Sequence, residues 1–272
     1  MKFIVIVNPF SGKKQGLEIF NKIKQKFDSK NIDLTLIRTE FPGHAERIIK
    51  ECNFENYNGI LMIGGDGTFH EIVNGMFNRR DKKKIPIGII PGGTGNSFML
   101  DLGIIDPNDA VDRILLNKTR FVDIIKLDMG QTVKYSINLV GWGMITDIGL
   151  TAENLRWMGN ARYTISAIIH IFFKNDRKAK FEVNGKRSVN NYMFVIGCNS
   201  INVGKGMRMA PKAKLDDGLM DIIVVDSNIS RLRLLSVLPK LFNGTHIDEP
   251  EVQYYQSKKF SLIPDNDDSL II

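Results

Sequence analysis

The sequence predicts an α/β domain with a parallel sheet, followed by a second, mainly antiparallel β domain. Short apolar runs alternate with helix-like segments over about the first 125 residues, and strand-like segments dominate afterwards. The 272 residues are also enough to build two hydrophobic cores. We therefore divide the chain into domains at residues 1–125 and 126–272.

In the first domain, short apolar runs predict strands that are covered on both faces. The runs are rich in β-branched residues and mostly lack polar–apolar alternation, which is typical of parallel strands between two layers of helices. They are residues 3–7, 32–37, 60–63 and 85–90. Apolar residues at helical spacing predict helices between them, at residues 17–27, 44–52 and 69–77.

In the second domain, strand-like segments are joined mostly by turns. The predicted strands are residues 133–140, 179–183, 192–198, 220–225 and 252–263. The dipeptide Asn184-Gly185 is a strong signal for a tight hairpin turn. Two segments with helical periodicity, residues 161–173 and 230–242, interrupt the strands.

The turn Gly64-Gly65-Asp66-Gly67-Thr68 directly follows the third predicted strand and is the strongest functional signal in the chain. Glycine lets backbone N–H groups approach an anion, and the N-terminus of the next helix adds partial positive charge. Thr68 and Glu71 have the spacing of a capping box at the start of that helix. An ordinary turn is the alternative, but it needs neither the three glycines nor the carboxylate between them.

Two further loops follow predicted strands of the same domain and also lead into helix-like segments. They are Asn8-Pro9-Phe10-Ser11-Gly12 and Pro91-Gly92-Gly93-Thr94-Gly95-Asn96. Parallel sheets bind ligands beyond the carboxyl ends of their strands, so this topology brings the loops together. We expect them to hold a polyphosphate, although each loop alone could be a tight connector.

Charge and composition narrow the classes of protein. The net charge of +7 favours an acidic partner, and the densest basic cluster is Arg79-Arg80-Asp81-Lys82-Lys83-Lys84. A solvated loop is the default interpretation of this cluster. If the cluster binds a partner, anionic lipid headgroups fit better than nucleic acid, because no aromatic residues interleave with it to stack on bases.

The remaining compositional signals concern the compartment. Cys52 and Cys198 have neither disulfide-framework nor metal-ligand spacing, and we expect two buried thiols in a reducing cytoplasm. The N-terminus predicts a strand rather than a secretory leader. The longest apolar stretch, residues 165–173, is far shorter than the roughly 20 residues that span a bilayer, so we expect no integral membrane segment.

Four motifs, in this order, resemble those of the diacylglycerol kinase catalytic family of lipid kinases, which includes small bacterial enzymes and the sphingosine and ceramide kinases. The motifs are Asn8-Pro9 with Ser11-Gly12, Gly64 to Thr68 with Glu71, Pro91 to Asn96, and Lys214-Leu215-Asp216-Asp217-Gly218-Leu219. The resemblance covers nearly the whole chain. It implies an N-terminal α/β ATP-binding domain, a C-terminal lipid-binding β-sandwich, and the use of ATP and Mg²⁺.

The resemblance also implies roles for particular residues. Asp66 matches the family's key acidic residue, which either activates the acceptor hydroxyl or organises Mg²⁺. Asp147 matches a carboxylate that recognises the lipid headgroup in sphingosine kinases, although it could equally pair within the fold. The nucleotide contacts that the resemblance implies are Asn8, Pro9, Phe10, Ser11, Gly12, Thr39, Gly64, Gly65, Asp66, Gly67, Thr68, Phe69, His70, Glu71, Gly93, Thr94, Gly95 and Asn96.

A magnesium site and an acyl pocket are also implied by this resemblance. The bacterial members bind Mg²⁺ through a carboxylate and backbone carbonyls, which match Asp217, Lys214 and Leu219. A simple β-turn is the alternative for this segment. The apolar helix predicted at residues 161–173 could line an acyl pocket, with core packing as the alternative.

The chain departs from the family at its C-terminal end. Family members usually continue past the strand that matches residues 260–272 into an Asp-Gly-Glu segment with another active-site acid. Either this sequence is truncated or the protein lacks that acid, and we expect weak or no kinase activity from the 272 residues. The alternatives are a soluble-substrate kinase similar to NAD kinase and a catalytically inactive lipid- or nucleotide-binding protein. The first βα turn lacks the G-x-G-x-x-G fingerprint of a dinucleotide oxidoreductase.

The expected partner is a lipid at a membrane surface, and we expect no nucleic-acid partner. The expected location is the cytoplasm, with peripheral binding at the inner membrane surface. The identity of the lipid stays open, as does the formation of a homodimer.

Overall fold

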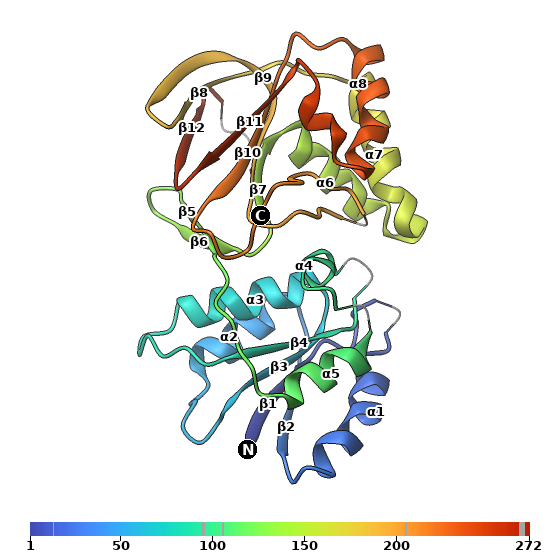
Figure 1. Ribbon diagram of the computed structural model, residues 1–272, viewed down its shortest axis with the longest axis vertical. Helices are drawn as coiled ribbons and strands as arrows, with labels where there is room; N and C mark the ends of the chain where they lie inside the picture. Colours follow the sequence, from blue (N-terminus) through green and yellow to red (C-terminus); the bar gives the residue numbers. More distant parts are fainter. Residues whose placement is uncertain (13, 94–95, 105, 205, 267–269) are drawn as a thin grey trace. The chain divides into compact units, whose positions relative to one another are not determined.

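The structure, a computed structural model, describes residues 1–272 apart from 13, 94–95, 105, 205 and 267–269, and it does not describe the side chains of residues 156 and 160. The chain divides into two compact units (Figure 1). Unit 1 consists of Met1–Phe121 and Lys126–Ser136, and unit 2 consists of Val122–Ile125 and Ile137–Ile272. The chain therefore passes between the units three times near the boundary expected after residue 125.

Unit 1 contains a four-stranded parallel sheet in the order β2-β1-β3-β4. Its strands are β1 (Lys2–Val7), β2 (Asp33–Arg38), β3 (Gly59–Gly64) and β4 (Ile87–Pro91). All six residues of β3 are buried, as its unbroken apolar sequence requires. The predicted parallel sheet is confirmed, and each strand lies within two residues of its predicted position.

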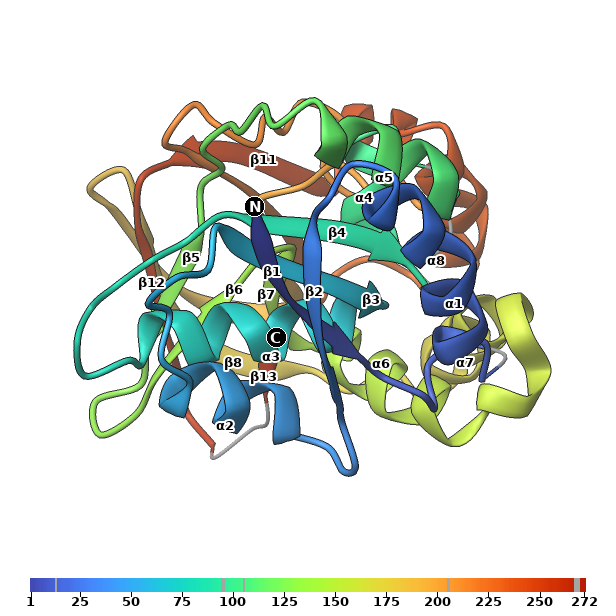
Figure 2. The same ribbon diagram turned by 90° about the horizontal axis from the view of Figure 1, so that it is seen from below.

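Helices cover both faces of this sheet (Figure 2). They are α1 (Gly16–Asp28), α2 (His44–Glu51), α3 (Asp66–Phe77), α4 (Ser97–Asp101) and α5 (Pro107–Leu115). On the face of α1 and α5, Phe20, Ile23 and Val111 share a core with Val5 and Ile63. Side chains alternate along a strand, so the intervening buried residues of β1 and β3 face α2 and α3 on the other side.

The sequence analysis did not predict α4 and α5. A signal for α5 is present, because Asp106 precedes a proline at the first helical position. The carboxylate of Asp106 accepts the N–H groups of Asn108 at 2.7 Å and Asp109 at 3.1 Å, as an N-cap does. The segment that leads to β4 also differs from expectation, because β4 begins at Ile87 rather than at residue 85.

Unit 1 also includes a two-stranded ribbon of β5 (Ile125–Asp128) and β6 (Val133–Ser136). The buried amide of Asn74 on α3 holds β6: its Nδ2 donates to the Tyr135 carbonyl at 2.8 Å, and its Oδ1 accepts the Tyr135 N–H at 3.0 Å. This polar side chain satisfies the free edge of the ribbon in the way a neighbouring strand would.

Unit 2 contains an antiparallel sheet that branches at its longest strand. The strands are β7 (Leu139–Gly143), β8 (Arg177–Val183), β9 (Lys186–Cys198), β10 (Met220–Asp226), β11 (Val252–Ser257), β12 (Phe260–Pro264) and β13 (Leu270–Ile271). The first half of β9 pairs with β8, and its second half pairs with β7 and β10. The predicted hairpin is confirmed, because Asn184 and Gly185 take φ values of +50° and +75° between β8 and β9.

The two arms of this sheet enclose a common core, as expected of a β-sandwich. Phe181 on β8 and Phe260 on β12 lie in one arm, and Trp142, Val195 and Ile222 lie in the other. Gly197 lets the arms approach, because a Cβ at this position would lie 2.7 Å from the ring of Phe260. The fold class expected for the second domain is therefore confirmed.

Two predicted strands of this region are wrong in their extent. The run at residues 133–140 is broken between β6 and β7, because the chain passes from unit 1 to unit 2 after Ser136. The run at residues 252–263 is broken after Ser257, whose hydroxyl donates to the Lys259 carbonyl at 2.8 Å and closes a turn. Each break lies between segments of strand-like composition, so local sequence gave no sign of it.

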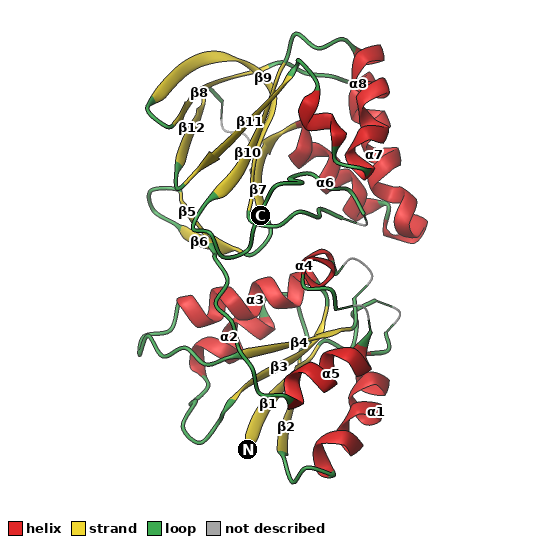
Figure 3. Ribbon diagram, in the orientation of Figure 1, coloured by secondary structure: helices red, strands yellow, loops and turns green. Residues whose placement is uncertain are grey.

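Helices cover the other face of the larger arm (Figure 3). They are α6 (Met144–Asn154), η1 (Arg156–Ala161), α7 (Arg162–Phe172), α8 (Arg231–Val237), η2 (Leu238–Phe242) and η3 (Thr245–Asp248). Met144, Ala167, Ile171 and Leu234 pack there against Met193 of β9. One side of α7 therefore belongs to the core, and no observation places an acyl pocket along it.

The basic cluster at residues 79–84 differs in part from a solvated loop. Arg79 is only 4% exposed, and it donates to the carbonyls of Ile49 and Cys52 while its guanidinium lies 3.7 Å from the centre of the Phe54 ring. It also pairs with Asp81, and this hydrogen bond lowers the pKa of Asp81 to about 2. Arg79 is thus a structural residue, whereas the four other basic residues of the cluster are exposed.

Candidate functional site

The loops after β1 and β3 lie at the point where the strand order of unit 1 reverses. The chain passes from β1 to β2 on one side and then returns to place β3 on the other side of β1. At such a switch point the loops leave in opposite directions and open a crevice, which is where open α/β sheets bind ligands. The Asn8 to Gly12 loop and the Gly64 to Thr68 turn are therefore neighbours at the ligand-binding edge.

Asn8 connects these two loops directly. Its backbone N–H donates to the carbonyl of Ile63 at 3.1 Å, and its Nδ2 donates to Oγ1 of Thr68 at 3.2 Å. Its Oδ1 accepts the N–H of Phe10 at 2.9 Å, which bends the first loop into an Asx turn. Phe10 itself is 66% exposed, so its ring makes little contact with the protein.

The third loop packs on the first two through glycine. The N–H groups of Gly92 and Gly93 donate to the carbonyl of Gly64 at 2.8 and 3.1 Å. Gly12 takes a φ of +57°, and a Cβ there would lie 2.5 Å from the carbonyl oxygen of Gly92. Backbone therefore lies against backbone at this edge, and the three loops expected to meet do so, although Thr94 and Gly95 lie outside the described residues.

Asp66 joins the second loop to the third. It is the first residue of α3, and its carboxylate accepts the N–H groups of Ser97 at 2.7 Å and Phe98 at 3.3 Å, at the start of α4. The side chain therefore lies between two helix starts with its orientation held by backbone donors. Gly67 follows it on the exposed surface, and a Cβ there would meet no atom within 4 Å, which leaves space beside the first turn of α3.

The predicted capping box is wrong. α3 begins two residues before Thr68, with Gly65 as its N-cap and no side-chain cap bond. Glu71 instead binds the start of α2: its Oε1 accepts the N–H of Gly43 at 2.8 Å, and its Oε2 accepts the N–H of Ala45 at 3.1 Å. Sequence spacing suggested a partner within α3. The backbone N–H groups at the start of α2 have no acceptor inside their own helix, and the Glu71 side chain is long enough to reach them.

Two other expected nucleotide contacts occupy supporting positions. Phe69 is 4% exposed and packs on Phe98, with ring centroids 5.1 Å apart. Thr39 is buried at the end of β2, where its N–H donates to the carbonyl of Val7 at 2.9 Å. Both side chains shape the edge of the sheet from within the fold.

His70 lies one turn after Asp66 on α3. Its Nε2 is 3.2 Å from Nδ2 of Asn74. Burial lowers the pKa of His70, and the positive charge of Lys134 lowers it further, while Glu46 acts in the opposite direction. The imidazole is therefore neutral at pH 7 and adds no positive charge to a phosphate site.

Asn96 provides a polar atom that the described residues do not satisfy. It takes a left-handed φ of +50° at the N-cap of α4, and its Nδ2 donates to the carbonyl of Gly93 at 2.9 Å. Its Oδ1 is buried and has no hydrogen-bond partner within the part of the chain that the structure describes. Such an acceptor fits a hydroxyl or amino group of a nucleotide.

In unit 2, the expected magnesium ligands lie in a loop that a second carboxylate organises. Oδ1 of Asp217 accepts the N–H of Leu219 at 3.0 Å, and Oδ2 of Asp123 accepts the N–H of Gly218 at 2.7 Å. The N–H of Asp123 in turn donates to the carbonyl of Leu215 at 2.6 Å. Sequence reasoning missed Asp123, which is 94 residues before Asp217, near the end of the first predicted domain, and which the structure assigns to unit 2.

The donor set of this loop fits Mg²⁺ through oxygen alone. Asp217 offers a carboxylate, and the carbonyls expected from Lys214 and Leu219 are hard oxygen donors of the type that Mg²⁺ prefers beside retained water. The described residues contain no group of three or more His, Cys, Asp or Glu side chains that could hold a metal. A side-chain cage is therefore absent from the described part, and a site here would depend on backbone carbonyls.

A buried carboxyl group follows this loop. Asp221 on β10 is fully buried, and it accepts the hydroxyl of Tyr254 at 2.5 Å and Nε2 of Gln256 at 3.1 Å. Burial is the main cause that raises the pKa of Asp221, and the charge of Asp217 adds to it. These hydrogen bonds hold the start of β10 to β11.

Asp147, the expected headgroup contact, is already paired within the fold. It lies on α6, and its carboxylate forms a two-pronged ion pair with Arg177, at 2.9 Å to Nη1 and 3.1 Å to Nη2. Its side chain is 27% exposed, so it remains partly accessible. Of the two interpretations left open by the sequence, the internal pair is the one present here, and a headgroup role stays a prediction.

The parallel sheet, the backbone-lined loops at its switch point and the oriented Asp66 define an α/β unit of the class that binds ligands beyond the carboxyl ends of its strands. Comparisons with known proteins show what this unit and the second one are similar to. The model of the diacylglycerol kinase catalytic domain matches residues 2–127, and that of the YegS C-terminal NAD kinase beta sandwich-like domain matches residues 138–271. Residues 2–127 are therefore similar to the diacylglycerol kinase catalytic domain, which confirms the resemblance inferred from the motifs.

Curated relatives and a solved structure agree with this similarity. Sphingosine kinase 1 of Arabidopsis thaliana is 30% identical over 97% of this chain and 64% of its own length. The diacylglycerol kinase of Staphylococcus carnosus (strain TM300) is 29% identical over 95% of this chain and 83% of its own length. A crystal structure of a protein assigned as a diacylglycerol kinase from Bacillus anthracis str. Sterne has a TM-score of 0.83 and 23% identity, covering 99% of this chain and 87% of that one.

This chain thus spans slightly less than two thirds of the length of the two Arabidopsis sphingosine kinases that it matches. The structural similarity, at 23% identity, supports the two-domain fold alone. Within the described residues, none of the helices combines the length and apolarity that crossing a membrane requires.

Proposed function

We propose that this protein is an ATP-dependent lipid kinase that transfers the γ-phosphate of ATP to a lipid hydroxyl. The observation that carries the proposal is the meeting of three glycine-containing loops at the switch point of unit 1, with Asp66 oriented between two helix starts. The similarity to the diacylglycerol kinase catalytic domain supports ATP as the phosphate donor. The relatives support a lipid acceptor, because they are sphingosine, ceramide and diacylglycerol kinases.

The loops would bind the phosphates through backbone donors. The first turn of α3 leaves N–H groups without partners inside the helix, and its dipole favours negative charge at this end. Gly67 leaves room for phosphate oxygens to approach the backbone, because a Cβ there would meet no atom within 4 Å. Nucleotide contacts by the Asn8 to Gly12 loop, the Gly64 to Thr68 turn and the third loop stay proposals, which binding of ATP to loop variants tests.

In the proposed reaction, Asp66 acts on the acceptor hydroxyl. The hydroxyl oxygen attacks the γ-phosphorus, the bond from that phosphorus to the β,γ-bridging oxygen breaks, and ADP leaves. The carboxylate of Asp66 takes the hydroxyl proton or holds the hydroxyl in line for attack. Backbone donors from Ser97 and Phe98 hold the carboxylate in one orientation, so that little reorganisation accompanies the transfer.

Mg²⁺ would neutralise charge on the phosphates. The residues that would hold a Mg²⁺ ion in unit 2 are Asp217, through its carboxylate, and Lys214 and Leu219, through their carbonyls. Asp123 would keep their loop in place. Asp147 would contact the headgroup of the lipid only if its carboxylate bound Arg177 and the headgroup together, or if Arg177 moved away from it. ATP is a cytoplasmic substrate, so we place the protein in the cytoplasm, where it reaches lipid at a membrane surface.

A labelling assay tests this proposal. The protein is incubated with radiolabelled ATP, Mg²⁺ and, separately, diacylglycerol, sphingosine, ceramide or NAD. We expect label in a lipid, with a loss of about 100-fold or more in Asp66→Asn. Asp33→Asn is the matched control, because Asp33 is exposed at the opposite, amino-terminal end of a strand in the same sheet.

The outcomes separate the alternatives. Label in NAD alone would identify a soluble-substrate kinase. ATP binding without transfer to any acceptor would identify a nucleotide-binding protein without kinase activity. The expectation of weak turnover stays a prediction, and the absolute rate in the same assay measures it.

A further inference from the structure

Unit 2 contains a depression at the point where the two arms of its sheet end. Val183 and Phe260 line it from β8 and β12 of one arm, and Gln256 lines it from β11 of the other. Leu219, directly before β10, adds a further wall, whereas Asp217 does not line it. The volume of about 560 Å³ is that of a small-molecule site. We call it the sandwich-end depression.

Two turns form the rim of the sandwich-end depression. They are Asn184-Gly185 between β8 and β9, and Lys258-Lys259 between β11 and β12. Nδ2 of Asn184 donates to the carbonyl of Gln256 at 3.1 Å, which ties the first turn to the strand that leads into the second. The hydroxyl of Ser257 closes the second turn, and β8 pairs directly with β12. The two sides of the rim are therefore fixed relative to each other by hydrogen bonds.

The rim of the sandwich-end depression carries positive charge. Lys258 and Lys259 are exposed, and neither forms an ion pair with a residue that the structure describes. Glu182 is the carboxylate among the described lining residues, and it accepts Nε of Arg187 at 2.8 Å. The charge of Glu182 is thus already balanced by a neighbour. Two unbalanced ammonium groups remain, and they favour an anion.

Backbone donors are free at both turns of the rim. Within the described part of the chain, the N–H groups of Asn184, Gly185 and Lys258 donate to no acceptor. A Cβ at Gly185 would meet no atom within 4 Å, so space lies open beside this backbone. Turn N–H groups and ammonium groups are donors that phosphate oxygens accept well.

The walls below the rim are apolar. Val183 is 3% exposed and shares the core of the sandwich with Phe260, which is half-buried. Leu219 is half-buried as well. A bare inorganic anion gains nothing from such walls, whereas an apolar group attached to the anion would be transferred out of water. The chemistry of the sandwich-end depression therefore fits an anion with an apolar body.

We propose that the sandwich-end depression binds a phosphate monoester that carries an apolar group. The phosphate accepts hydrogen bonds from Lys258, Lys259 and the turn N–H groups, and the apolar group lies against Leu219 and Phe260. A phosphorylated lipid has this chemistry, and its identification as the product of the same enzyme rests on the proposed function. Because Leu219 also belongs to the loop of the expected magnesium ligands, a product bound here contacts that loop.

Isothermal titration calorimetry without ATP tests the proposal. The probes are water-soluble dihexanoyl phosphatidic acid, glycerol 3-phosphate, inorganic phosphate and the uncharged dihexanoylglycerol. We expect dihexanoyl phosphatidic acid to bind at least about tenfold more tightly than glycerol 3-phosphate or inorganic phosphate, because only the first fills the apolar walls. Equal affinity for inorganic phosphate would overturn the assignment of the ligand.

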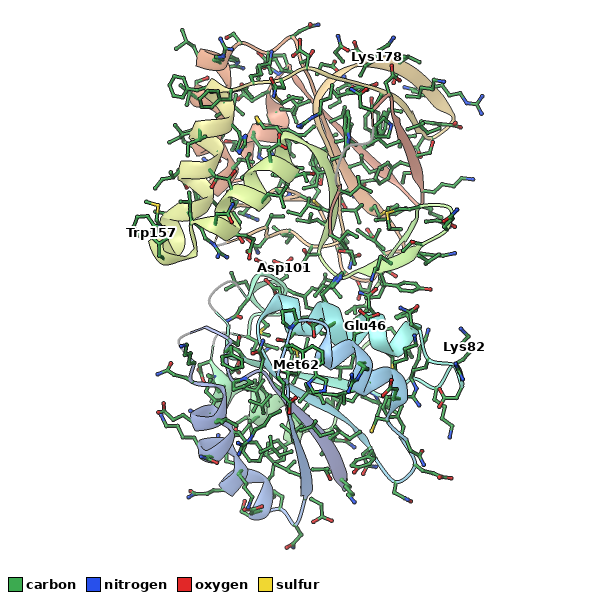
Figure 4. The ribbon with its side chains drawn as sticks, turned by 180° about the vertical axis from the view of Figure 1, so that it is seen from behind. Glu46, Met62, Lys82, Asp101, Trp157 and Lys178 are labelled. Atoms are coloured by element: carbon green, nitrogen blue, oxygen red, sulfur yellow. The ribbon has the colours of Figure 1, made fainter. Side chains whose placement is uncertain are left out.

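Two variants locate the binding. Lys258→Gln/Lys259→Gln should weaken the binding of dihexanoyl phosphatidic acid by at least about tenfold, because two charge-assisted contacts are lost. The matched control is Lys82→Gln/Lys83→Gln, which removes the same charge from an exposed turn of unit 1, and Figure 4 shows Lys82 at the surface there. Ser261→Trp keeps both rim lysines but puts an indole into the space, since Ser261 is exposed and lines the depression.

The outcomes of these titrations are all decisive. Loss of binding in both variants, with native circular dichroism spectra and an unaffected control, supports the proposal. Loss in the lysine variant alone would show binding to surface charge outside the depression, and unchanged affinity in both variants would also overturn the proposal. Dihexanoylglycerol should bind all variants equally, because it lacks the phosphate that the rim recognises.

The sandwich-end depression is distinguishable from the catalytic centre. A product could also bind near Asp66, so Asp66→Asn should leave the lysine-dependent binding unchanged. Binding that is lost in Asp66→Asn and retained in Lys258→Gln/Lys259→Gln would assign the ligand to the catalytic centre and overturn the second site. Failure of the proposed function has a different sign, since it leaves every lipid unlabelled in the kinase assay while the calorimetric result stands.

Discussion

Glu71 offers a prediction that separates structural from ligand-binding roles in unit 1. Its carboxylate accepts two backbone N–H groups at the start of α2, from Gly43 at 2.8 Å and Ala45 at 3.1 Å. Removing one helix cap costs about 1 kcal/mol, and a hydrogen bond to a charged group contributes roughly 1.5–3 kcal/mol. Because water can partly replace the lost acceptor at this half-exposed position, we expect Glu71→Ala to cost about 2–3 kcal/mol in local stability.

Glu71→Gln should have about half of this effect. The glutamine keeps one oxygen for Gly43 or Ala45 but presents an amide N–H group to the other donor. Glu51→Ala is the matched control, because Glu51 is exposed at the last position of α2, where a negative charge is unfavourable. We expect that control to leave the helix unchanged or slightly more stable.

Hydrogen exchange measures the effect where it arises. A loss of about 2 kcal/mol in the opening of α2 makes amide exchange at residues 43–48 about 30-fold faster. Denaturant titration is less informative, because the two units need not unfold together. Unchanged exchange in α2, combined with loss of ATP binding by Glu71→Gln, would refute the capping argument and make Glu71 a ligand contact.

Three further predictions concern the loops and α3. Asn8→Ala should weaken ATP binding by about tenfold, because it frees both Thr68 and the turn at Phe10, and calorimetry with ATP would show the change. Gly12→Ala should abolish ATP binding, since its Cβ would lie 2.5 Å from a carbonyl oxygen; undiminished affinity would show that the loops do not need this contact. The pKa of His70 is lowered in the folded protein, so His70 becomes protonated in the unfolded chain before it does in the folded one as pH falls below about 6.5. This favours the unfolded state, and unit 1 should lose stability by up to about 1.4 kcal/mol per pH unit below that value. His70→Gln should reduce this acid sensitivity in thermal melts between pH 7.5 and 5, and an equally steep loss in the variant would contradict the assignment.

Much of the candidate site was predictable because its signals are local. Gly12 and Gly92 are needed where backbone lies on backbone, and such positions appear as glycine clusters after apolar runs. The strand order that brings these loops together follows from parallel topology. Asp106 and the proline that follows it also predict the start of α5, although the sequence analysis did not use that signal.

The partners of individual polar side chains were not predictable in the same way. Glu71 was expected to serve its own helix but binds α2, and Arg79 was expected in solvent but is buried against carbonyls of a distant segment. Asp147 had two candidate roles, and the structure shows the ion pair with Arg177. Each choice depends on which donor or acceptor happens to lie within about 3 Å after folding, a distance that sequence spacing does not encode.

The sequence by itself therefore determined the buried strands, the glycine loops at their ends and the acidic residue among them. Hydrophobic periodicity and backbone freedom are properties of neighbouring residues, so they can be read along the chain. Only the tertiary structure decided that Asp66 joins two helix starts, that Asp123 supports the Asp217 loop, and that α7 presents a second apolar side to solvent. These features depend on packing between segments far apart in sequence, where geometry selects one contact among many chemically equivalent ones.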